Sequence, residues 1–297
     1  MKILLFGKSG QLGWELQRTL SLLGTLIALD RSGSEDLCGN LSDLEGLRNT
    51  INAVKPDIIV NAAAYTAVDK AENEPELVQL INAQAPELLA QEAKRINALL
   101  VHYSTDYVFS GKGKAPWNEN DDPEPLNQYG QSKLVGEQSI QASGCKYLIF
   151  RTSWVYGNKG NNFAKTMLRL SSERQSLSII NDQMGAPTSA ALLADCTAHS
   201  IYQAVYNPQL LGLYHLSASG KTTWYEYANL VIEYARTMGK ELLVNEIKPI
   251  TTLEYPTPAK RPLNSRLDTT KFCNNFNLAL PQWQDGVIRM LNETNNY

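Results

Sequence analysis

Lys2-Ile3-Leu4-Leu5-Phe6-Gly7-Lys8-Ser9-Gly10-Gln11-Leu12-Gly13 begins at the second residue of the chain and decides its fold. The apolar run 2–6 is typical of a strand that is buried on both faces of a parallel sheet. Leu12, Leu16 and Leu20 then recur at helical spacing. The pattern predicts a strand, a glycine-rich turn and a helix, an arrangement that can hold a dinucleotide pyrophosphate at the helix N-terminus.

The three glycines of this loop have different expected roles. Gly7 would allow the tight turn, Gly10 would let the backbone approach a phosphate, and Gly13 would let the helix pack closely on the sheet. Their spacing, Gly-x-x-Gly-x-x-Gly, differs from the Gly-x-Gly-x-x-Gly fingerprint of dinucleotide-binding proteins. The alternative is an ordinary glycine-rich turn, but the flanking strand and helix and an acid further along favour the dinucleotide.

That acid is Asp30, which ends a second predicted strand, 26–30, and lies 20 residues after Gly10. A carboxylate at this place can accept a hydrogen bond from a ribose 2′-hydroxyl, which favours NAD. Arg31 follows directly and Lys8 lies in the loop, and either cation could bind the 2′-phosphate of NADP. The sequence therefore leaves the choice between NADH and NADPH open.

Tyr129 and Lys133 form the one Tyr-x-x-x-Lys pair of the chain, near the start of a predicted helix 128–142. Residues four apart on a helix project from the same face. A nearby ammonium favours phenolate, so we expect Lys133 to lower the pKa of Tyr129 and to assist proton transfer near neutral pH. The alternative is a surface pair without chemistry.

Two hydroxyls, Ser104 and Thr105, stand at the carboxyl end of the predicted strand 98–104. We expect Thr105 to hydrogen-bond a substrate carbonyl and polarise it, with Ser104 as the competing candidate and a strand-end cap as the structural alternative. A glycine loop, a hydroxyl and a Tyr-Lys pair together predict a nicotinamide-dependent oxidoreductase.

Strands and helices alternate through the first half of the chain, which predicts an α/β protein with a Rossmann-type doubly wound parallel sheet. Predicted strands are 2–6, 26–30, 57–61, 98–104, 146–151 and 212–216, predicted helices are 12–20, 43–54, 75–96, 128–142, 163–172, 190–206 and 223–238, and 249–263 is a predicted long loop. We expect a dinucleotide-binding domain at 1–157 with a returning segment near 187–217. A smaller, interleaved C-terminal substrate domain would comprise 158–186 and 218–297.

Composition argues against several other classes of protein. The 297 residues are 43% hydrophobic and carry a net charge of -3 with interspersed signs, which disfavours a nucleic-acid partner. The chain has neither the run of about 18 apolar residues that a membrane span requires nor a secretory leader, so we expect a cytoplasmic protein. The cysteines and histidines show no ligand spacing, which predicts reduced thiols, structural histidines and no catalytic zinc.

Several longer segments resemble a known family, the dTDP-4-dehydrorhamnose reductases, which are a branch of the extended short-chain dehydrogenases/reductases. The matching segments, spread over almost the whole chain, are 2–13, Asn61-Ala62-Ala63-Ala64-Tyr65-Thr66-Ala67-Val68-Asp69-Lys70-Ala71-Glu72, Tyr103-Ser104-Thr105-Asp106-Tyr107-Val108-Phe109, Tyr129-Gly130-Gln131-Ser132-Lys133, Arg151-Thr152-Ser153-Trp154-Val155-Tyr156, Asn161-Asn162-Phe163, Asp182-Gln183-Met184-Gly185-Ala186-Pro187-Thr188 and Arg261-Pro262. This similarity is far more specific than the glycine loop or the Tyr-Lys pair alone.

The resemblance implies reduction of the C4 ketone of dTDP-4-dehydro-L-rhamnose by NADPH or NADH. The product, dTDP-L-rhamnose, would supply bacterial surface polysaccharide such as the O-antigen of lipopolysaccharide. Tyr129 would be the proton donor, Lys133 its partner and Thr105 the third catalytic residue, while Asp106 and Trp154 would bind the sugar. Trp154 could pack its aromatic face on the apolar CH groups of a deoxysugar, or it could be a core residue. The implied cofactor-binding residues are Gly7, Gly10, Gln11, Leu12, Gly13, Asp30, Arg31, Asn40, Leu41, Ala64, Tyr65, Thr66, Tyr103, Tyr129 and Lys133.

The chain departs from the family pattern at one place that concerns metal and assembly. Some members are metal-bridged homodimers that use acidic residues. Glu15 and Glu293 match two of these positions, but Ala191 stands at the third. We therefore expect Mg²⁺ to be weak or dispensable and assign no metal ligand, and we expect a homodimer.

Two other functions remain as alternatives at this stage. A nucleotide-sugar dehydratase or epimerase shares the fold and the Tyr-Lys pair, but a dehydratase commonly has an Asp-Glu pair after the Thr. Here Asp106 is followed by Tyr107. A non-catalytic dinucleotide-binding regulatory subunit would have no need of an intact Thr-Tyr-Lys set.

Overall fold

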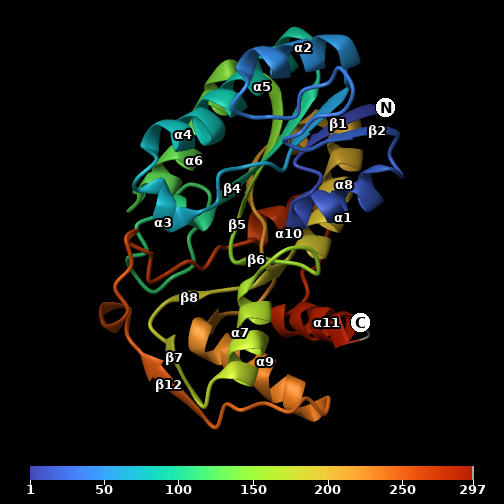
Figure 1. The fold of residues 1–297 in the computed structure, drawn as a ribbon. Coiled ribbons are helices and arrows are strands. Elements are labelled where there is room, and N and C mark those ends of the chain that lie inside the picture. Colours follow the sequence, from blue (N-terminus) through green and yellow to red (C-terminus); the bar gives the residue numbers. More distant parts are fainter. Residues whose placement is uncertain (296–297) are drawn as a thin grey trace.

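The computed structural model describes residues 1–295 and contains a central six-stranded parallel sheet (Figure 1). Its strands are β1 (Lys2–Phe6), β2 (Thr25–Leu29), β3 (Ile58–Asn61), β4 (Leu99–Thr105), β5 (Lys146–Thr152) and β10 (Gly212–His215), in the order β10-β5-β4-β3-β1-β2. The predicted strands are confirmed to within two residues at each end, and with them the doubly wound α/β fold.

Helices cover both faces of the sheet. Successive side chains of β1 alternate, so that Ile3 and Leu5 enter one core and Leu4 and Phe6 the other. The first core is closed by α1 (Gln11–Leu20), α8 (Ala190–Tyr206) and α10 (Thr270–Phe276), and the second by α2 (Leu44–Val54), α5 (Ala85–Arg95) and α6 (Gln128–Ser143). Burial on both faces explains the continuous apolar runs that predicted these strands.

The order of the strands reverses direction between β1 and β3. The chain runs outward from β1 to β2 and then returns to β3 on the other side of β1. Loops that leave the carboxyl ends of these two strands diverge, which opens a crevice where doubly wound proteins bind ligands. Gly7 follows β1 and Ala62 follows β3 at this point.

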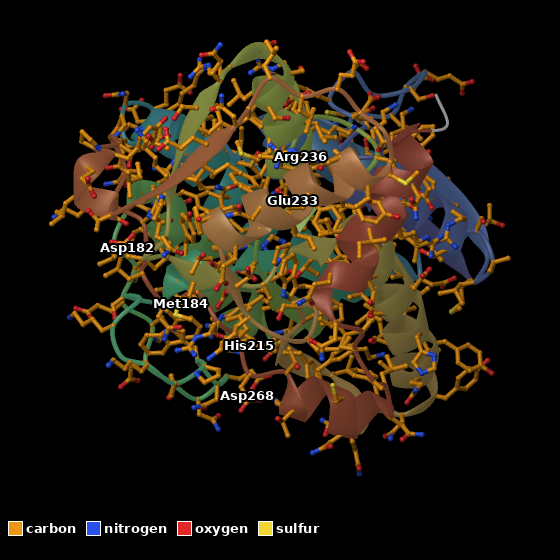
Figure 2. The ribbon with its side chains drawn as sticks, turned by 90° about the horizontal axis from the view of Figure 1, so that it is seen from below. Asp182, Met184, His215, Glu233, Arg236 and Asp268 are labelled. Atoms are coloured by element: carbon orange, nitrogen blue, oxygen red, sulfur yellow. The ribbon has the colours of Figure 1, made fainter. Side chains whose placement is uncertain are left out.

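A second, smaller layer lies below the carboxyl ends of the sheet (Figure 1). Its helices α7 (Phe163–Glu173), α9 (Trp224–Thr237) and α11 (Trp283–Asn295) enclose their own apolar core with the parallel pair β7 (Ser176–Ile180) and β12 (Glu246–Ile250). Glu233 and Arg236 form an ion pair on α9, seen from below in Figure 2. Helix α9 begins with a capping box between Thr223 and Glu226.

Short elements connect the two layers. β6 (Val155–Tyr156) pairs with β9 (Thr188–Ser189), and β8 (Met184–Gly185) pairs with β11 (Thr222–Thr223). Helix α10, which the sequence assigned to the substrate domain, packs against β10 and α8 of the sheet core. The division into domains at 157/158, 186/187 and 217/218 stays a prediction. Among residues 1–295, no helix is long and apolar enough to cross a membrane.

The predicted helix 75–96 is not one regular helix. It consists of α4 (Pro75–Gln79), a π-helical turn (Leu80–Gln84) and α5. Pro86 has no backbone N–H to donate to the carbonyl oxygen of Asn82, so the regular hydrogen-bond ladder is interrupted there. The Asn82 side chain instead accepts from Tyr65 N at 2.9 Å and donates to Tyr65 O at 3.0 Å, which ties the turn to the loop after β3.

The prediction of a single loop over 249–263 was wrong at its start. Pro249 and Ile250 complete β12, and Thr252–Glu254 form a single helical turn. Proline is tolerated because β12 is an edge strand that pairs with β7 alone within the described chain. Helices α10 and α11 were not predicted. Short elements α3 (Val68–Ala71), Asp106–Val108 and Pro208–Leu210 complete the fold.

Gly13→Ala is expected to destabilise the protein. A Cβ at this position would lie 1.9 Å from the carbonyl oxygen of Gly7, so α1 would have to move away from the end of β1. Overpacking of this kind costs about 1–3 kcal/mol, measurable as a lower free energy of unfolding in urea. Gly10→Ala is the matched control, because its Cβ would meet Gly7 O at an ordinary 3.4 Å. Equal losses in both variants would contradict the close-packing role of Gly13.

Candidate active site

A cavity of about 950 Å³ opens at the carboxyl ends of β1, β3 and β4 and extends to the smaller layer. The structure brings most of the predicted site residues together around it. Its lining includes Gly7, Gly10, Gln11, Leu12, Asp30, Arg31, Ala64, Thr66, Tyr103, Thr105, Asp106, Tyr129, Lys133 and Trp154. Segments far apart in sequence thus converge at the point where the strand order reverses.

The glycine loop forms one wall of this cavity with its backbone. Gly7 has a positive φ of 89°, and both its N–H and that of Lys8 donate to Leu29 O, at 2.8 and 3.1 Å. Gly10 precedes the first turn of α1, and no side chain caps that turn. Free N–H groups at the start of a helix, with no Cβ beside them, suit the pyrophosphate of a dinucleotide.

Directly after β2, Asp30 lies beside Lys8 of the glycine loop, as the sequence indicated. Its carboxylate accepts hydrogen bonds from Ser32 Oγ at 2.6 Å and Ser9 Oγ at 2.7 Å, while Lys8 Nζ lies 4.0 Å away. The hydroxyls of Ser32 and Ser9 lower the pKa of Asp30, so it stays ionised. Both serines line the cavity and were missed, although a serine two residues after an aspartate is a common turn signal.

Four predicted cofactor contacts are absent from the cavity lining. Gly13 packs beneath the loop against Gly7, and Leu41 belongs to the core between α2 and the sheet. Asn40 accepts hydrogen bonds from Ser42, and Tyr65 donates its hydroxyl proton to Glu74 at 2.7 Å. Their contact with a cofactor stays a prediction.

Lys133 is almost completely buried and anchored at the end of β4. Its Nζ donates to the carbonyl oxygen of Tyr103 at 2.6 Å and lies 3.2 Å from His102 Nε2. Burial lowers the pKa of Lys133 to about 8, and the charge of Glu137 opposes this shift. His102 in turn lies 3.1 Å from Asn61 Nδ2, and burial lowers its pKa well below the ordinary value, so it is a neutral, hydrogen-bonded side chain.

The expected effect of Lys133 on Tyr129 was wrong. The pKa of Tyr129 is raised to about 12, because burial disfavours the phenolate more than the Thr105 hydroxyl favours it. The Lys133 ammonium is directed at the Tyr103 carbonyl rather than at the phenol. Tyr129 is therefore a neutral phenol in this structure, and Lys133 contacts the backbone rather than promoting a phenolate.

Thr105 lies between Tyr129 and Asp106. Its hydroxyl donates to Asp106 Oδ1 at 3.1 Å and accepts from Tyr107 N at 3.1 Å. Ser104 Oγ and Thr152 Oγ1 also face the cavity and are buried without a hydrogen-bond partner among the described residues. Unpaired polar atoms of this kind are costly unless a ligand engages them, which marks this part of the cavity as a binding surface.

Aromatic rings form the opposite wall. Trp154 has a positive φ of 47° and stacks on Trp224 with ring centroids 3.6 Å apart and planes 14° from parallel. A Cβ at Gly185 would lie 2.6 Å from the Trp154 ring, so only glycine fits behind it. Trp224 was missed because no local pattern links it to a residue 70 positions earlier. Lining residues that were likewise not proposed are Ala62, Ala63, Val68, Tyr107, Thr152 and Val155.

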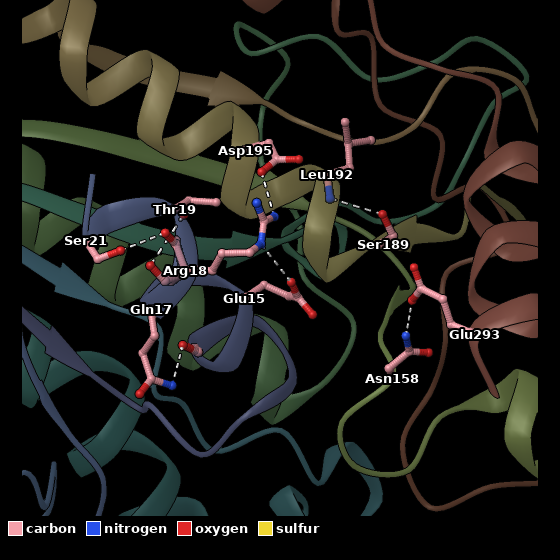
Figure 3. Close-up of polar contacts among 12 residues, drawn as sticks. Glu15, Gln17, Arg18, Thr19, Ser21, Asn158, Ser189, Leu192, Asp195 and Glu293 are labelled. Carbon is pink, nitrogen blue, oxygen red and sulfur yellow. Dashed lines mark hydrogen bonds and ion pairs between the residues drawn. The ribbon is translucent and has the colours of Figure 1, made fainter. Parts of the chain in front are cut away.

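The positions that concern metal and assembly lie around a second cavity of about 380 Å³. Arg18 lies 3.8 Å from Glu15 and 2.8 Å from Asp195 on α8, and Glu293 accepts from Asn158 (Figure 3). Within residues 1–295, no group of three or more His, Cys, Asp or Glu side chains could hold a metal ion. The Mg²⁺ and homodimer expectations stay predictions.

Residues 1–296 match the family described as "RmlD substrate binding domain". The chain belongs to this family. It is 61% identical over 293 residues to the dTDP-4-dehydrorhamnose reductase of Escherichia coli K12, covering 99% of this chain and 98% of that protein. The corresponding reductase of Burkholderia thailandensis is 42% identical over 293 residues, covering 97% of both chains.

Solved structures agree with this assignment. A dTDP-4-dehydrorhamnose reductase from Bacillus anthracis, solved in complex with NADP, has a TM-score of 0.87 and 35% identity, covering 98% of this chain and 99% of that chain. The reductase from Clostridium acetobutylicum has a TM-score of 0.89 and 34% identity, covering 99% of this chain and 100% of that chain. The sequence resemblance to this family is thereby confirmed over the full length.

Burial of Lys133 predicts a pH-dependent stability. The folded pKa is about 8, whereas the unfolded chain keeps a value near 10.4. Between these values the unfolded chain binds more protons, so folding becomes more favourable as the pH rises. Lys133→Met removes this titration. From about pH 7 to about pH 10, the free energy of unfolding of the parent should rise relative to this variant by up to about 3 kcal/mol.

Urea denaturation at both pH values measures this difference. Lys146→Met, at an exposed residue, is the matched control for loss of a lysine. A difference between parent and Lys133→Met that does not change with pH would mean that the buried ammonium keeps an ordinary pKa.

Proposed function

We propose that this protein reduces the C4 ketone of dTDP-4-dehydro-L-rhamnose to dTDP-L-rhamnose with NADPH or NADH. The observation that carries the proposal is the convergence of the glycine loop, Thr105, Tyr129 and Lys133 on one cavity. Membership of the family and 61% identity to a protein named for this reaction support the choice of substrate. This reaction is the last step of dTDP-L-rhamnose synthesis.

The glycine-loop end of the cavity fits a nicotinamide dinucleotide. The N-terminus of α1 and the Cβ-free backbone at Gly10 would hold the pyrophosphate, and Asp30, with Arg31 beside it, would meet the adenosine ribose. When bound, the reduced cofactor supplies the hydride. Tyr103 and Lys133 line the cavity near the end of β4, where the nicotinamide half would lie.

Around the substrate ketone, the side chains of this protein supply the proton and hold the oxygen. Tyr129, neutral because its pKa is raised to about 12, donates its proton to the oxygen that becomes the C4 hydroxyl. Thr105 contacts the same oxygen. Lys133 holds the Tyr103 carbonyl and thereby the backbone beside the reacting atoms. The added hydride and this proton make up the new alcohol, and water reprotonates Tyr129.

The sugar is proposed to lie between Asp106 and the tryptophan pair. Trp154 lines the cavity and offers apolar ring surface that suits the CH groups of a deoxysugar, and stacking on Trp224 fixes its orientation. Trp224 Nε1 donates to Gln183 Oε1 at 3.1 Å, so the pair is also anchored from the smaller layer.

The alternative functions fit the site less well. A dehydratase needs a further acid-base pair, but Tyr107 follows Asp106 and its ring packs edge-on against Tyr129, with centroids 5.9 Å apart. A regulatory subunit would not require the buried Lys133 and its anchor. We further propose a cytoplasmic homodimer whose product supplies surface polysaccharide such as O-antigen; the family resemblance supports this.

Oxidation of NADPH in the presence of dTDP-4-dehydro-L-rhamnose, followed by absorbance, tests the proposed function. Stoichiometric oxidation supports the reductase. A dehydratase would consume no net cofactor, and a regulatory subunit would turn over nothing, so absence of NADPH oxidation would reject the proposal. UDP- and GDP-linked keto sugars in parallel reveal whether the base is recognised.

Tyr129→Phe should keep NADPH binding and lower kcat by about 10²-fold or more, since only the transferable proton is lost. Cofactor affinity is measured by fluorescence titration and kcat by NADPH oxidation. Tyr234→Phe is the control, because its hydroxyl contacts Asn292 outside the cavity. A near-normal kcat for Tyr129→Phe would remove this residue from the mechanism.

Asp30→Ala should shift cofactor preference toward NADPH. The variant loses the acceptor for a ribose 2′-hydroxyl and the repulsion of a 2′-phosphate, while Arg31 and Lys8 remain. A charge-assisted hydrogen bond contributes about 1.5–3 kcal/mol, so the ratio of kcat/KM for NADPH over NADH should rise by about ten-fold or more. Asp36→Ala, at an exposed residue outside the cavity lining, is the control. An unchanged ratio would place Asp30 away from the ribose.

A further inference from the structure

Asp106 is a buried acid in the cavity, and one of its carboxyl oxygens has no hydrogen-bond partner among the described residues. It follows Thr105 at the end of β4, is 3% exposed and lines the cavity. Its Oδ1 accepts from the Thr105 hydroxyl at 3.1 Å, while its Oδ2 is buried and has no hydrogen-bond partner among the described residues. A buried carboxylate normally has several donors, so this arrangement suits a neutral acid better than an anion.

The groups that face Asp106 do not hold it ionised. Burial raises its pKa to about 7, and the hydroxyls of Ser265 and Thr105 only partly oppose that rise. The neighbouring titratable groups are the phenols of Tyr107 on its own segment and Tyr129 on α6.

The cations in this region are engaged with other partners. Arg261 forms an ion pair with Asp69 at 2.7 Å and reaches Tyr107, and Lys133 is bound to the Tyr103 carbonyl. Asp106 can therefore change its protonation state near neutral pH without a charged partner.

The protonation state of Asp106 decides where the single proton of the Thr105 hydroxyl points. Thr105 Oγ1 already accepts from Tyr107 N, which leaves one further lone pair and one proton. With Asp106 ionised, that proton is given to Oδ1, and the remaining lone pair attracts the Tyr129 hydroxyl. With Asp106 protonated, its own O–H can fill the lone pair, and the Thr105 proton becomes free to point into the cavity.

We propose that Asp106 is a positioning residue that must be protonated for reduction, because only then do Thr105 and Tyr129 both direct their protons at the substrate ketone. This inference rests on the proposed reductase function and adds a regulation by pH to the same site. No additional reactant is needed. Asp106 keeps its proton throughout, and the proton transferred to the substrate still comes from Tyr129.

Single-turnover rates of NADPH oxidation across the neutral pH range test this role. The parent should lose rate about ten-fold per pH unit above the pKa of Asp106, as expected for one essential proton. Asp106→Asn carries an amide N–H that can donate to Thr105 Oγ1 as the protonated acid does. Its rate should be lower than the maximum of the parent but should no longer fall over this range.

Asp122→Asn, at an exposed residue outside the cavity, is the matched control and should keep the pH profile of the parent. If the parent is active and Asp106→Asn still loses rate at alkaline pH as the parent does, the proposed role of Asp106 is overturned. The proposed reductase function would then still stand. A parent that oxidises no NADPH at any pH rejects the proposed function instead.

A stability measurement tests the protonation without any turnover. The folded pKa of Asp106 is raised above that of the unfolded chain, so the folded state binds more protons between the two values and loses stability as the pH rises through them. Asp106→Asn lacks this loss. The free energy of unfolding of the variant minus that of the parent should therefore be larger at slightly alkaline pH than at mildly acidic pH. A difference that is independent of pH would mean that Asp106 stays ionised, and would overturn the proposal.

Discussion

The hydrogen bond from Lys133 Nζ to the Tyr103 carbonyl oxygen holds the candidate active site together. It joins the first turns of α6 to the carboxyl end of β4, so it fixes the distance between Tyr129 on the helix and Thr105 on the strand. Burying the charged Lys133 ammonium costs free energy, and this cost appears as the lowered pKa of Lys133. One turn further along α6, Glu137 forms a buried ion pair with Arg151 of β5 at 2.6 Å, which adds a second link between this helix and the sheet.

The two ends of the cavity offer different physical means of binding a ligand. At the glycine loop, backbone amides are available to a ligand, and the packing of Gly13 on Gly7 keeps them in place. At the other end, the stacked Trp154 and Trp224 present flat apolar surface, and unpaired hydroxyls present hydrogen-bonding groups. The two proposed ligands differ in the same way. A phosphate-rich cofactor requires positive partial charge and close approach of the backbone, whereas a deoxysugar requires a complementary apolar shape with a few polar contacts.

Local patterns predicted the central sheet well because its strands are buried on both faces and its turns carry glycine. The strand 2–6 and the helix 190–206 agree with the structure at both ends. The prediction of helices and strands was weaker where the backbone hydrogen-bonding pattern depends on contacts with distant residues. The π-helical turn at Leu80–Gln84 depends on Pro86 and on the distant partner of Asn82, and β12 depends on pairing with β7. Neither contact leaves a periodic signal in the chain.

The sequence by itself determined the fold class and the family and predicted Thr105, Tyr129 and Lys133 as a candidate set, because short-range spacing and order carry that information. Only the tertiary structure decided the electrostatics of this set. Burial, which depends on all neighbours at once, raises the pKa of Tyr129 and lowers that of Lys133, opposite to the effect on Tyr129 expected from helical spacing alone. The pairing of Trp154 with Trp224 and the unpaired oxygen of Asp106 likewise arise from segments that meet only in the folded chain.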